Sequence, residues 1–234
     1  MLRMDRTLMS AVAVVGILAG WCGLAAVRAQ TSAARGPAPS LVPPATPVKA
    51  PDSDGFLRRW LILEPIRVNG QLTETAVQSA VKTDTFTGQV ADVPRAGETM
   101  TVDGTTLVWH AVDTIRYNVN LFHFAYALNK PTSNVLFWVA TVVQTPREMS
   151  GVRLAIGSNA ASIWWVNGTE VIGIYNDRQT VIDDGVSKRL TLKKGPNVIR
   201  GAIVNAGGAT DFCARFLDGD DRPIRTITVT LTNR

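Results

Sequence analysis

The segment Gly157-Ser-Asn-Ala-Ala-Ser-Ile-Trp-Trp-Val-Asn-Gly-Thr-Glu-Val171 decides the fold class of this chain. Residues 162–166 form a short aromatic and β-branched run, Asn167-Gly168 follows, and a second run begins at Glu170. Asn and Gly both tolerate positive φ, so this pair between two such runs is the strongest short-range signal for a β-hairpin. The segment therefore predicts a strand, a two-residue turn and another strand.

Similar short runs continue along the chain, whereas only residues 73–81 have the apolar spacing of a short amphipathic helix. The predicted strands are 60–66, 106–112, 135–143, 152–156, 163–166, 171–175, 187–192, 197–204, 212–217 and 224–231. Turn residues separate most of them. Strands at this spacing predict an all-β fold, a two-sheet antiparallel β-sandwich.

The first residues have the features of an export signal. Arg3 and Arg6 precede an apolar or small run over 11–27, and Val27-Arg-Ala29 offers small residues for cleavage. We expect residues 1–29 to be a secretory signal peptide and the protein to be periplasmic or extracellular. The run of 17 residues is somewhat short for a membrane span of about 20, so an uncleaved anchor is the alternative, and it alone would bring membrane contact.

Residues 30–53 are rich in Pro and Ala, which favours an extended, semi-stiff linker. Residues 54–234 then form the predicted sandwich domain, long enough for a substantial core.

Charge and cysteine content argue against a nucleic-acid-binding protein and against an internal disulfide. The chain carries a formal net charge of +5, which falls to +3 without residues 1–29, and its basic pairs are scattered among acids. Nucleic acid is therefore not an expected partner. Cys213 is the one cysteine after the signal segment, so it has no internal disulfide partner and is interpreted as a small buried hydrophobe.

Several segments resemble a known family. Leu154-Ala-Ile-Gly-Ser-Asn159, Trp165-Val-Asn-Gly-Thr-Glu-Val171 and Leu192-Lys-Lys-Gly-Pro-Asn-Val198 are similar to the galactose-binding-like jelly-roll modules of secreted carbohydrate-active enzymes. The whole chain is also similar to short exported bacterial proteins named acetylxylan esterase. These resemblances imply a jelly-roll sandwich and binding to plant-type polysaccharide. The sequence departs from the modules at Asn159-Ala-Ala161, where they often have an acidic pair.

An esterase requires a nucleophile, a base and an oxyanion hole. The sequence has no Gly-x-Ser-x-Gly elbow, and it has only two histidines. If the chain is an esterase, the candidate residues are His110, His123, Ser158 and Asp113, with His110 and Asp113 as one example of a pair. Each histidine is otherwise interpreted as a structural residue on a strand. We expect a non-catalytic protein, with a carbohydrate esterase as the alternative.

A sugar site needs an exposed aromatic ring beside amide or carboxylate groups. Trp164 and Trp165 are adjacent on one predicted strand, so their side chains point to opposite faces. We expect Trp165 to be displayed, unless both rings serve packing. The further binding candidates are Tyr175, Asn176, Asp177, Arg178 and Asn205.

No cofactor is expected. Asp218, Asp220 and Asp221 occupy a Gly-containing turn and are candidates for a structural Ca²⁺, although Asp in such turns commonly serves backbone geometry. The expected partner is a polysaccharide or oligosaccharide, and a role as a structural surface module bound to an envelope protein is the remaining alternative.

Overall fold

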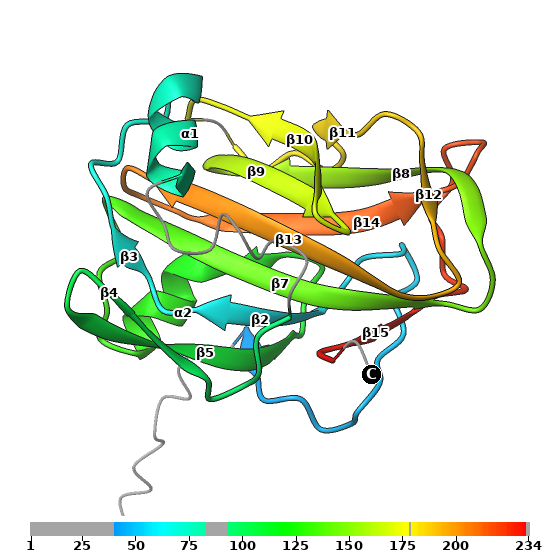
Figure 1. The fold of residues 1–234 in the computed structure, drawn as a ribbon, viewed down its shortest axis with the longest axis horizontal. Helices are drawn as coiled ribbons and strands as arrows, with labels where there is room; N and C mark the ends of the chain where they lie inside the picture. The colour runs from blue at the N-terminus through cyan, green and yellow to red at the C-terminus, as the bar shows by residue number, and fades with distance from the viewer. Residues whose placement is uncertain (1–39, 83–92, 178, 233–234) are drawn as a thin grey trace, which may run out of the picture. The chain divides into compact units, whose positions relative to one another are not determined.

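The predicted β-sandwich is confirmed: two antiparallel sheets pack face to face (Figure 1). The computed structural model describes residues 40–82, 93–177 and 179–232. The expected signal peptide and linker residues 30–39 lie outside the described residues. Within the described part of the chain, no helix is long and apolar enough to cross a membrane.

The larger sheet has the order β1-β5-β2-β7-β13-β9-β10, with β3 and β15 also paired to β7 and β4 to β5. Its long central pair, β7 with β13, runs in continuous register from Gly195 opposite Thr145 to Asn205 opposite Val135. The strands of this sheet are β1 (Leu41–Val42), β2 (Arg59–Leu63), β3 (Ile66–Arg67), β4 (Thr99–Val102), β5 (Thr105–Thr114), β7 (Val135–Thr145), β9 (Ala161–Val166), β10 (Thr169–Ile174), β13 (Gly195–Asn205) and β15 (Thr228–Thr230).

The smaller sheet has the order β11-β8-β14-β6, and β12 also pairs with β8. Its strands are β6 (Val119–Asn120), β8 (Met149–Ser158), β11 (Gly185–Val186), β12 (Leu190–Leu192) and β14 (Asp211–Leu217). All ten runs predicted from the sequence overlap observed strands.

The hairpin predicted at Asn167-Gly168 joins β9 to β10. Both turn residues have positive φ, 50° and 85°, and Thr169 pairs with Val166 directly beyond them. These dihedrals match the right-handed twist of the flanking strands, which explains why this dipeptide sets the register.

Two helices complete the described part of the fold. Helix α1 (Glu74–Lys82) matches the predicted helix. Helix α2 (Leu121–Ala127) was not predicted, and it places His123 on a helix rather than a strand. The Asn120 side chain accepts a hydrogen bond from the His123 backbone N–H at 2.7 Å, which caps the first turn of α2.

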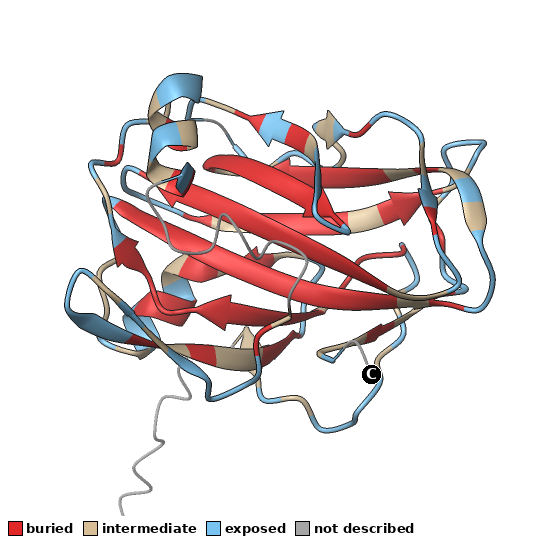
Figure 2. Ribbon diagram, in the orientation of Figure 1, coloured by how far each residue is buried: buried red, intermediate tan, exposed pale blue. Residues whose placement is uncertain are grey.

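The central strands of the larger sheet, β2, β7, β9 and β13, are buried on both faces, as the red strands in Figure 2 show. Its inner face meets the smaller sheet in the main core, where Trp164 packs against Phe212 and Trp60. Its outer face forms a second core with α1, which contributes Val77 and Val81. The second core is where the candidate site lies.

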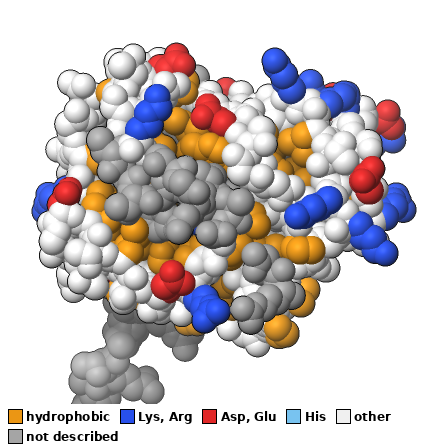
Figure 3. Space-filling view, in the orientation of Figure 1, with side chains coloured by type: hydrophobic (Ala, Val, Ile, Leu, Met, Phe, Trp, Pro, Cys, Tyr) orange, Lys and Arg blue, Asp and Glu red, His pale blue; other side chains and the backbone are white. Residues whose placement is uncertain are grey.

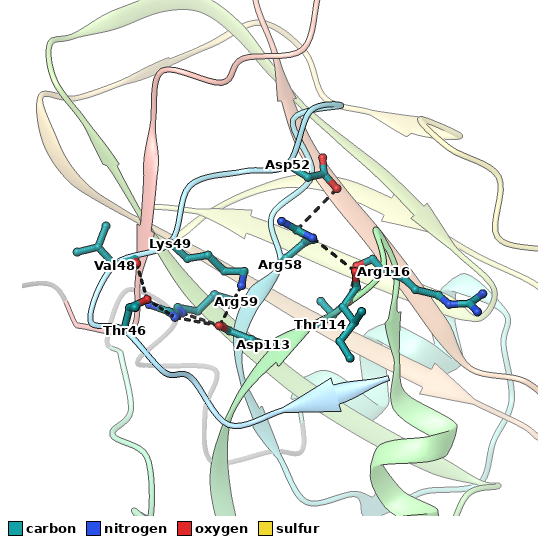
Figure 4. A network of polar contacts seen from close by, with 10 residues as sticks. Thr46, Val48, Lys49, Asp52, Arg58, Arg59, Asp113, Thr114 and Arg116 are labelled. Atoms are coloured by element: carbon teal, nitrogen blue, oxygen red, sulfur yellow. Dashed lines mark hydrogen bonds and ion pairs between the residues drawn. The ribbon is translucent and has the colours of Figure 1, made fainter. Parts of the chain in front are cut away.

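Part of the expected linker belongs to the fold. Leu41–Val42 pairs with β5, and Lys49 bridges to Val229. A buried ion pair anchors this segment: Arg59 donates to both carboxylate oxygens of Asp113 at 2.8 and 3.0 Å, and Lys49 reaches the same carboxylate at 3.1 Å (Figure 4). The sequence reading missed this because Pro-rich composition does not reveal long-range pairing.

Candidate functional site

A cavity of about 210 Å³ opens on the outer face of the larger sheet, between α1 and the β9–β10 hairpin. It is lined by both apolar and polar side chains. These are Gln78, Val81 and Lys82 from α1, Trp138 from β7, Ile163 and Trp165 from β9, and Glu170 from β10.

Two tryptophans form the apolar wall. The ring centroids of Trp138 and Trp165 lie 5.6 Å apart, with 31° between their planes. Trp165 faces away from Trp164, as the alternation on a strand predicts, but only 8% of it is exposed. The expectation that Trp165 is displayed is therefore corrected: α1 and the second core cover most of its ring, and the rest of the ring lines the cavity.

A buried cation lies behind this wall. Arg200, on β13, is opposite Trp165 in register, and its guanidinium carbon is 5.9 Å from the centroid of the Trp138 ring. Arg200 is 1% exposed. A cation over an indole face is attracted by the ring quadrupole, so this contact stabilises the position of the Trp138 ring.

Polar groups line the other side of the cavity. Glu170 is exposed and lies opposite Trp165 in the hairpin, so both side chains share the outer face. Lys82 is exposed at the end of α1, and Gln78 lies one turn earlier. The cavity thus combines an aromatic wall with an acid, a base and an amide.

Tyr175, predicted from the sequence as a binding residue, borders this group. Its hydroxyl accepts a hydrogen bond from Gln78 Nε2 at 3.5 Å, and Gly173 leaves space for it, since a Cβ there would be 2.6 Å from the hydroxyl oxygen. Burial raises the pKa of Tyr175, and the charges of Glu74 and Glu170 raise it further against the effect of the Gln78 hydrogen bond. Tyr175 is thus electrostatically coupled to the acid of the cavity.

The neighbouring candidates are not part of the cavity wall. Asn176 has a φ of 69° and its backbone N–H donates to the Leu72 carbonyl, so it makes a turn with its side chain exposed. Asp177 is exposed, and Arg178 lies outside the described residues.

Asn205 is a correction to the predicted site. It is buried, its Nδ2 donates to the Thr132 carbonyl at 2.8 Å, and its Oδ1 accepts from the Gly207 N–H at 3.3 Å. It lies five residues along β13 from Arg200, about 17 Å at the usual rise per residue. Its role is to hold two loops.

The esterase candidates do not form a catalytic group. Ser158 is completely buried and its hydroxyl donates to the Ala160 carbonyl at 2.7 Å. His123 is exposed on α2, and His110 lies 3.4 Å from Glu64. Asp113, the example partner for His110, is instead held by Arg59 and Lys49. A nucleophile must lie within hydrogen-bond reach of its base, and among the described residues no hydrogen bond joins Ser158 or Asp113 to either histidine.

Glu64 carries a second polar cluster around His110. Its carboxylate lies 2.9 Å from Lys130 Nζ and 3.4 Å from His110 Nε2. Burial raises the pKa of Glu64, but the hydrogen bonds and charges of Lys130 and His110 outweigh it and hold the pKa below its usual value.

The acidic turn is also occupied by protein partners. Asp218 accepts the backbone N–H groups of Asp220 and Arg222, both at 2.9 Å, and these bonds lower its pKa. Asp220 pairs with Arg222 and Asp221 with Arg153. Among the described residues no group of three or more acidic, His or Cys side chains could hold a metal ion, so the Ca²⁺ hypothesis is not supported at this turn.

No protein-family model matches the sequence, and no curated protein matches it significantly. The fold is similar to the PA14 domain of the antifreeze protein MpAFP, with a TM-score of 0.43 and 12% identity over 80% of this chain and 96% of that one. It is similar to the PA14 sugar-binding domain of an RTX adhesin, with a TM-score of 0.41 and 11% identity over 75% and 96%.

A third similar structure is the epithelial adhesin 9 A domain of Candida glabrata in complex with Galβ1-4GlcNAc, with a TM-score of 0.42 and 10% identity over 79% and 98%. The chain spans a smaller share, 41%, of a similar anti-sigma factor domain-containing protein. These similarities concern the arrangement of strands and assign no ligand to this chain.

The sequence pointed to Trp165 and Tyr175 as binding candidates but not to the residues that surround them in the structure. Gln78 and Lys82 come from the predicted helix, and the acidic residue of the hairpin, Glu170, was in the opening segment. The signal available was the hairpin register: with a two-residue turn at Asn167-Gly168, Glu170 lies directly opposite Trp165 and shares its face. Trp138 had no local signal, because only sheet order brings β7 near β9.

Proposed function

We propose that this protein is an exported carbohydrate-binding module that takes a sugar ring in the cavity beside Trp165. The observation that carries the proposal is the presence of Trp165, Glu170 and Gln78 in one cavity. Sugar rings present an apolar face and several hydroxyls, so an aromatic wall opposite hydrogen-bonding groups matches their chemistry.

The size of the cavity supports a short ligand. Its volume of about 210 Å³ is below the roughly 300 Å³ at which typical small-molecule sites begin. A single ring, at the end or side of a chain, fits this space better than several rings in a row. Glu170 and the Gln78 Oε1 would accept hydrogen bonds from sugar hydroxyls, and Lys82 would donate them, since the Gln78 amide N–H groups already donate to Glu74 and Tyr175.

Two sequence features support an exported sugar-binding protein. The N-terminal segment has the pattern of a secretory signal, and the segments around Trp165 resemble galactose-binding-like modules. Export would place the cavity where polysaccharides occur.

The proposal is tested by isothermal titration calorimetry with xylo-, cello-, manno- and galacto-oligosaccharides. Glu170→Gln keeps the size of the side chain and removes its charge. Because a hydrogen bond to a charged group contributes about 1.5–3 kcal/mol, this variant should bind at least tenfold more weakly. The matched control is Glu148→Gln, an exposed acid in the turn between β7 and β8.

We expect the control to bind within twofold of the unchanged protein. Absence of binding to every oligosaccharide, or equal affinity of Glu170→Gln and the unchanged protein, would overturn the proposal.

A further inference from the structure

The loops at one end of the sandwich form a basic surface that the sequence did not reveal. They are the turn between β7 and β8, the segments before and after β12, and the chain from the end of β14 to β15. Figure 3 shows Lys and Arg side chains gathered over this end, on the right of the view. We call this surface the basic end; its cations are Arg147, Arg153, Lys188, Arg189, Lys193, Lys194, Arg222 and Arg225, and its anions are Glu148, Asp218, Asp220 and Asp221.

Contacts between the loops show that they are one surface. Thr145 Oγ1 donates to the Lys193 carbonyl at 2.6 Å, which joins the β7 end to the β12–β13 loop. Arg189 donates to the Gly151 carbonyl at 2.8 Å, which joins the segment before β12 to the start of β8. Arg153 pairs with Asp221 at 3.2 Å, which adds the β14–β15 loop.

The anions neutralise only some of the cations. Asp221 is shared by Arg153 and Arg189, and Asp220 pairs with Arg222. Within the part of the chain that the structure describes, five exposed cations of the basic end have no ion-pair partner: Arg147, Lys188, Lys193, Lys194 and Arg225. These cations are available to an external anion.

We infer that the basic end binds an acidic polysaccharide through its uronate carboxylates. Guanidinium groups bind carboxylates in a bidentate fork, and ammonium groups bind them as point charges. The surface is separate from the cavity beside Trp165, so the inference goes beyond the proposed function and does not depend on it.

The composition of these loops favours this partner over other polyanions. Duplex DNA carries about one negative charge per 1.7 Å, and the interspersed Asp and Glu side chains would repel so dense a charge. The described segments that form the basic end, 145–153, 187–195 and 218–226, contain no aromatic residue. They therefore lack both the rings that stack on bases and the Trp and Tyr anchors typical of membrane interfaces. A polysaccharide with single, spaced carboxylates has a lower charge density than DNA, and its carboxylates can bind cations without aromatic contacts.

The test is calorimetric titration of the full chain with oligogalacturonate, compared with the same oligosaccharide as its methyl ester. The methyl ester keeps the sugar backbone and removes the charge, so it should not bind at the basic end. The charge-reversal variant is Lys188→Glu/Lys193→Glu/Lys194→Glu. Its control is Arg67→Glu/Arg95→Glu/Arg116→Glu, which has the same net charge but alters exposed cations outside the basic end.

We expect oligogalacturonate to bind the unchanged protein and the control variant within threefold of each other. The Lys188, Lys193 and Lys194 variant should bind at least tenfold more weakly, and raised salt should weaken binding, because exposed charges are screened. Circular dichroism spectra that match the unchanged protein exclude unfolding as the cause.

The inference is overturned if both triple variants lose affinity equally, or if the methyl ester binds as well as the acid. It is also overturned if duplex DNA or anionic phospholipid vesicles bind the basic end more tightly than oligogalacturonate. None of these outcomes alters the test of the cavity, because that test uses neutral sugars and Glu170.

Discussion

Trp164 and Trp165 follow each other on β9 but belong to separate cores on opposite faces of the larger sheet. Trp164 is completely buried between the sheets, 5.1 Å from Phe212 by ring centroids, whereas Trp165 packs on Trp138 on the outer face. One tryptophan therefore holds the sandwich together, and the other lines the cavity.

Because Trp164 and Trp165 lie in different cores, replacing each by alanine should lower the free energy of unfolding by different amounts. Trp164→Ala should lower the free energy of unfolding by about 3–5 kcal/mol, because it leaves a large void in the main core. Trp165→Ala should cost less, because its ring already borders open space. Urea denaturation of both variants measures the difference, and an equal or larger cost for Trp165→Ala would contradict the assignment.

Gly201 is the second test of the main core. A Cβ at this position would lie 2.6 Å from the ring of Trp164, so Gly201→Ala should force a shift in that ring. Overpacking of this kind costs about 1–3 kcal/mol in unfolding free energy. Gly219→Ala is the control, since a Cβ there meets no atom within 4 Å, and thermal unfolding should rank the two variants in this order. Equal stabilities would mean that Trp164 does not pack over Gly201.

The Arg59–Asp113 pair anchors the N-terminal segment. The side chains of both residues are buried, at 1% and 7% exposure, so Asp113→Asn should cost about 3–5 kcal/mol by leaving Arg59 without its anion. Asp220→Asn removes an exposed pair with Arg222 and should cost less than about 1 kcal/mol. Chemical denaturation at neutral pH measures the unfolding free energies of the two variants.

The same pair gives a pH dependence with a definite sign. Burial raises the pKa of Asp113, but the hydrogen bonds and charges of Arg59 and Lys49 outweigh it, so the pKa in the folded state is below the ordinary 3.8. The stabilisation is present above that ordinary value and is lost as pH falls through the folded pKa. Asp113→Asn should therefore lose less stability than the unchanged protein as the pH falls below about 4. A steeper loss in the variant would refute this.

Cys213 should be chemically inert in the folded protein. Burial, with smaller contributions from Asp183 and Asp211, raises the pKa of its thiol to about 12, and only the thiolate reacts. In a Cys22→Ser background, Ellman's reagent should modify Cys213 only after unfolding. Modification of the native protein at the rate of the unfolded chain would show that Cys213 is accessible.

The sequence predicted those features that depend on local pattern. Asn167-Gly168 specified the hairpin because two successive residues need positive φ, and the strand period separated Trp164 from Trp165. The strand predictions succeeded for the same reason, since β-branched runs between turn residues are local signals.

Features that depend on distant contacts were missed. Helix α2 is an exception, because its signals are local: its buried residues Leu121, Phe124 and Ala125 have helical spacing, and Asn120 caps its first turn. The basic end does depend on distant contacts, because the β8–β12 pairing brings the basic pairs Lys188-Arg189 and Lys193-Lys194, which flank β12, beside the turn between β7 and β8.

The proposed sugar site at Trp165 can be tested by measuring the chemical shifts of the indole N–H groups of the six tryptophans in a ¹⁵N-labelled sample. Xylotriose, cellotriose, mannotriose and lactose are titrated in turn. We expect at least one sugar to shift the Trp165 resonance, while Trp60 and Trp164, which are completely buried in the main core, stay unchanged. If none of the four sugars moves the Trp165 indole resonance, or if Trp60 and Trp164 shift as much as Trp165, the claim is contradicted.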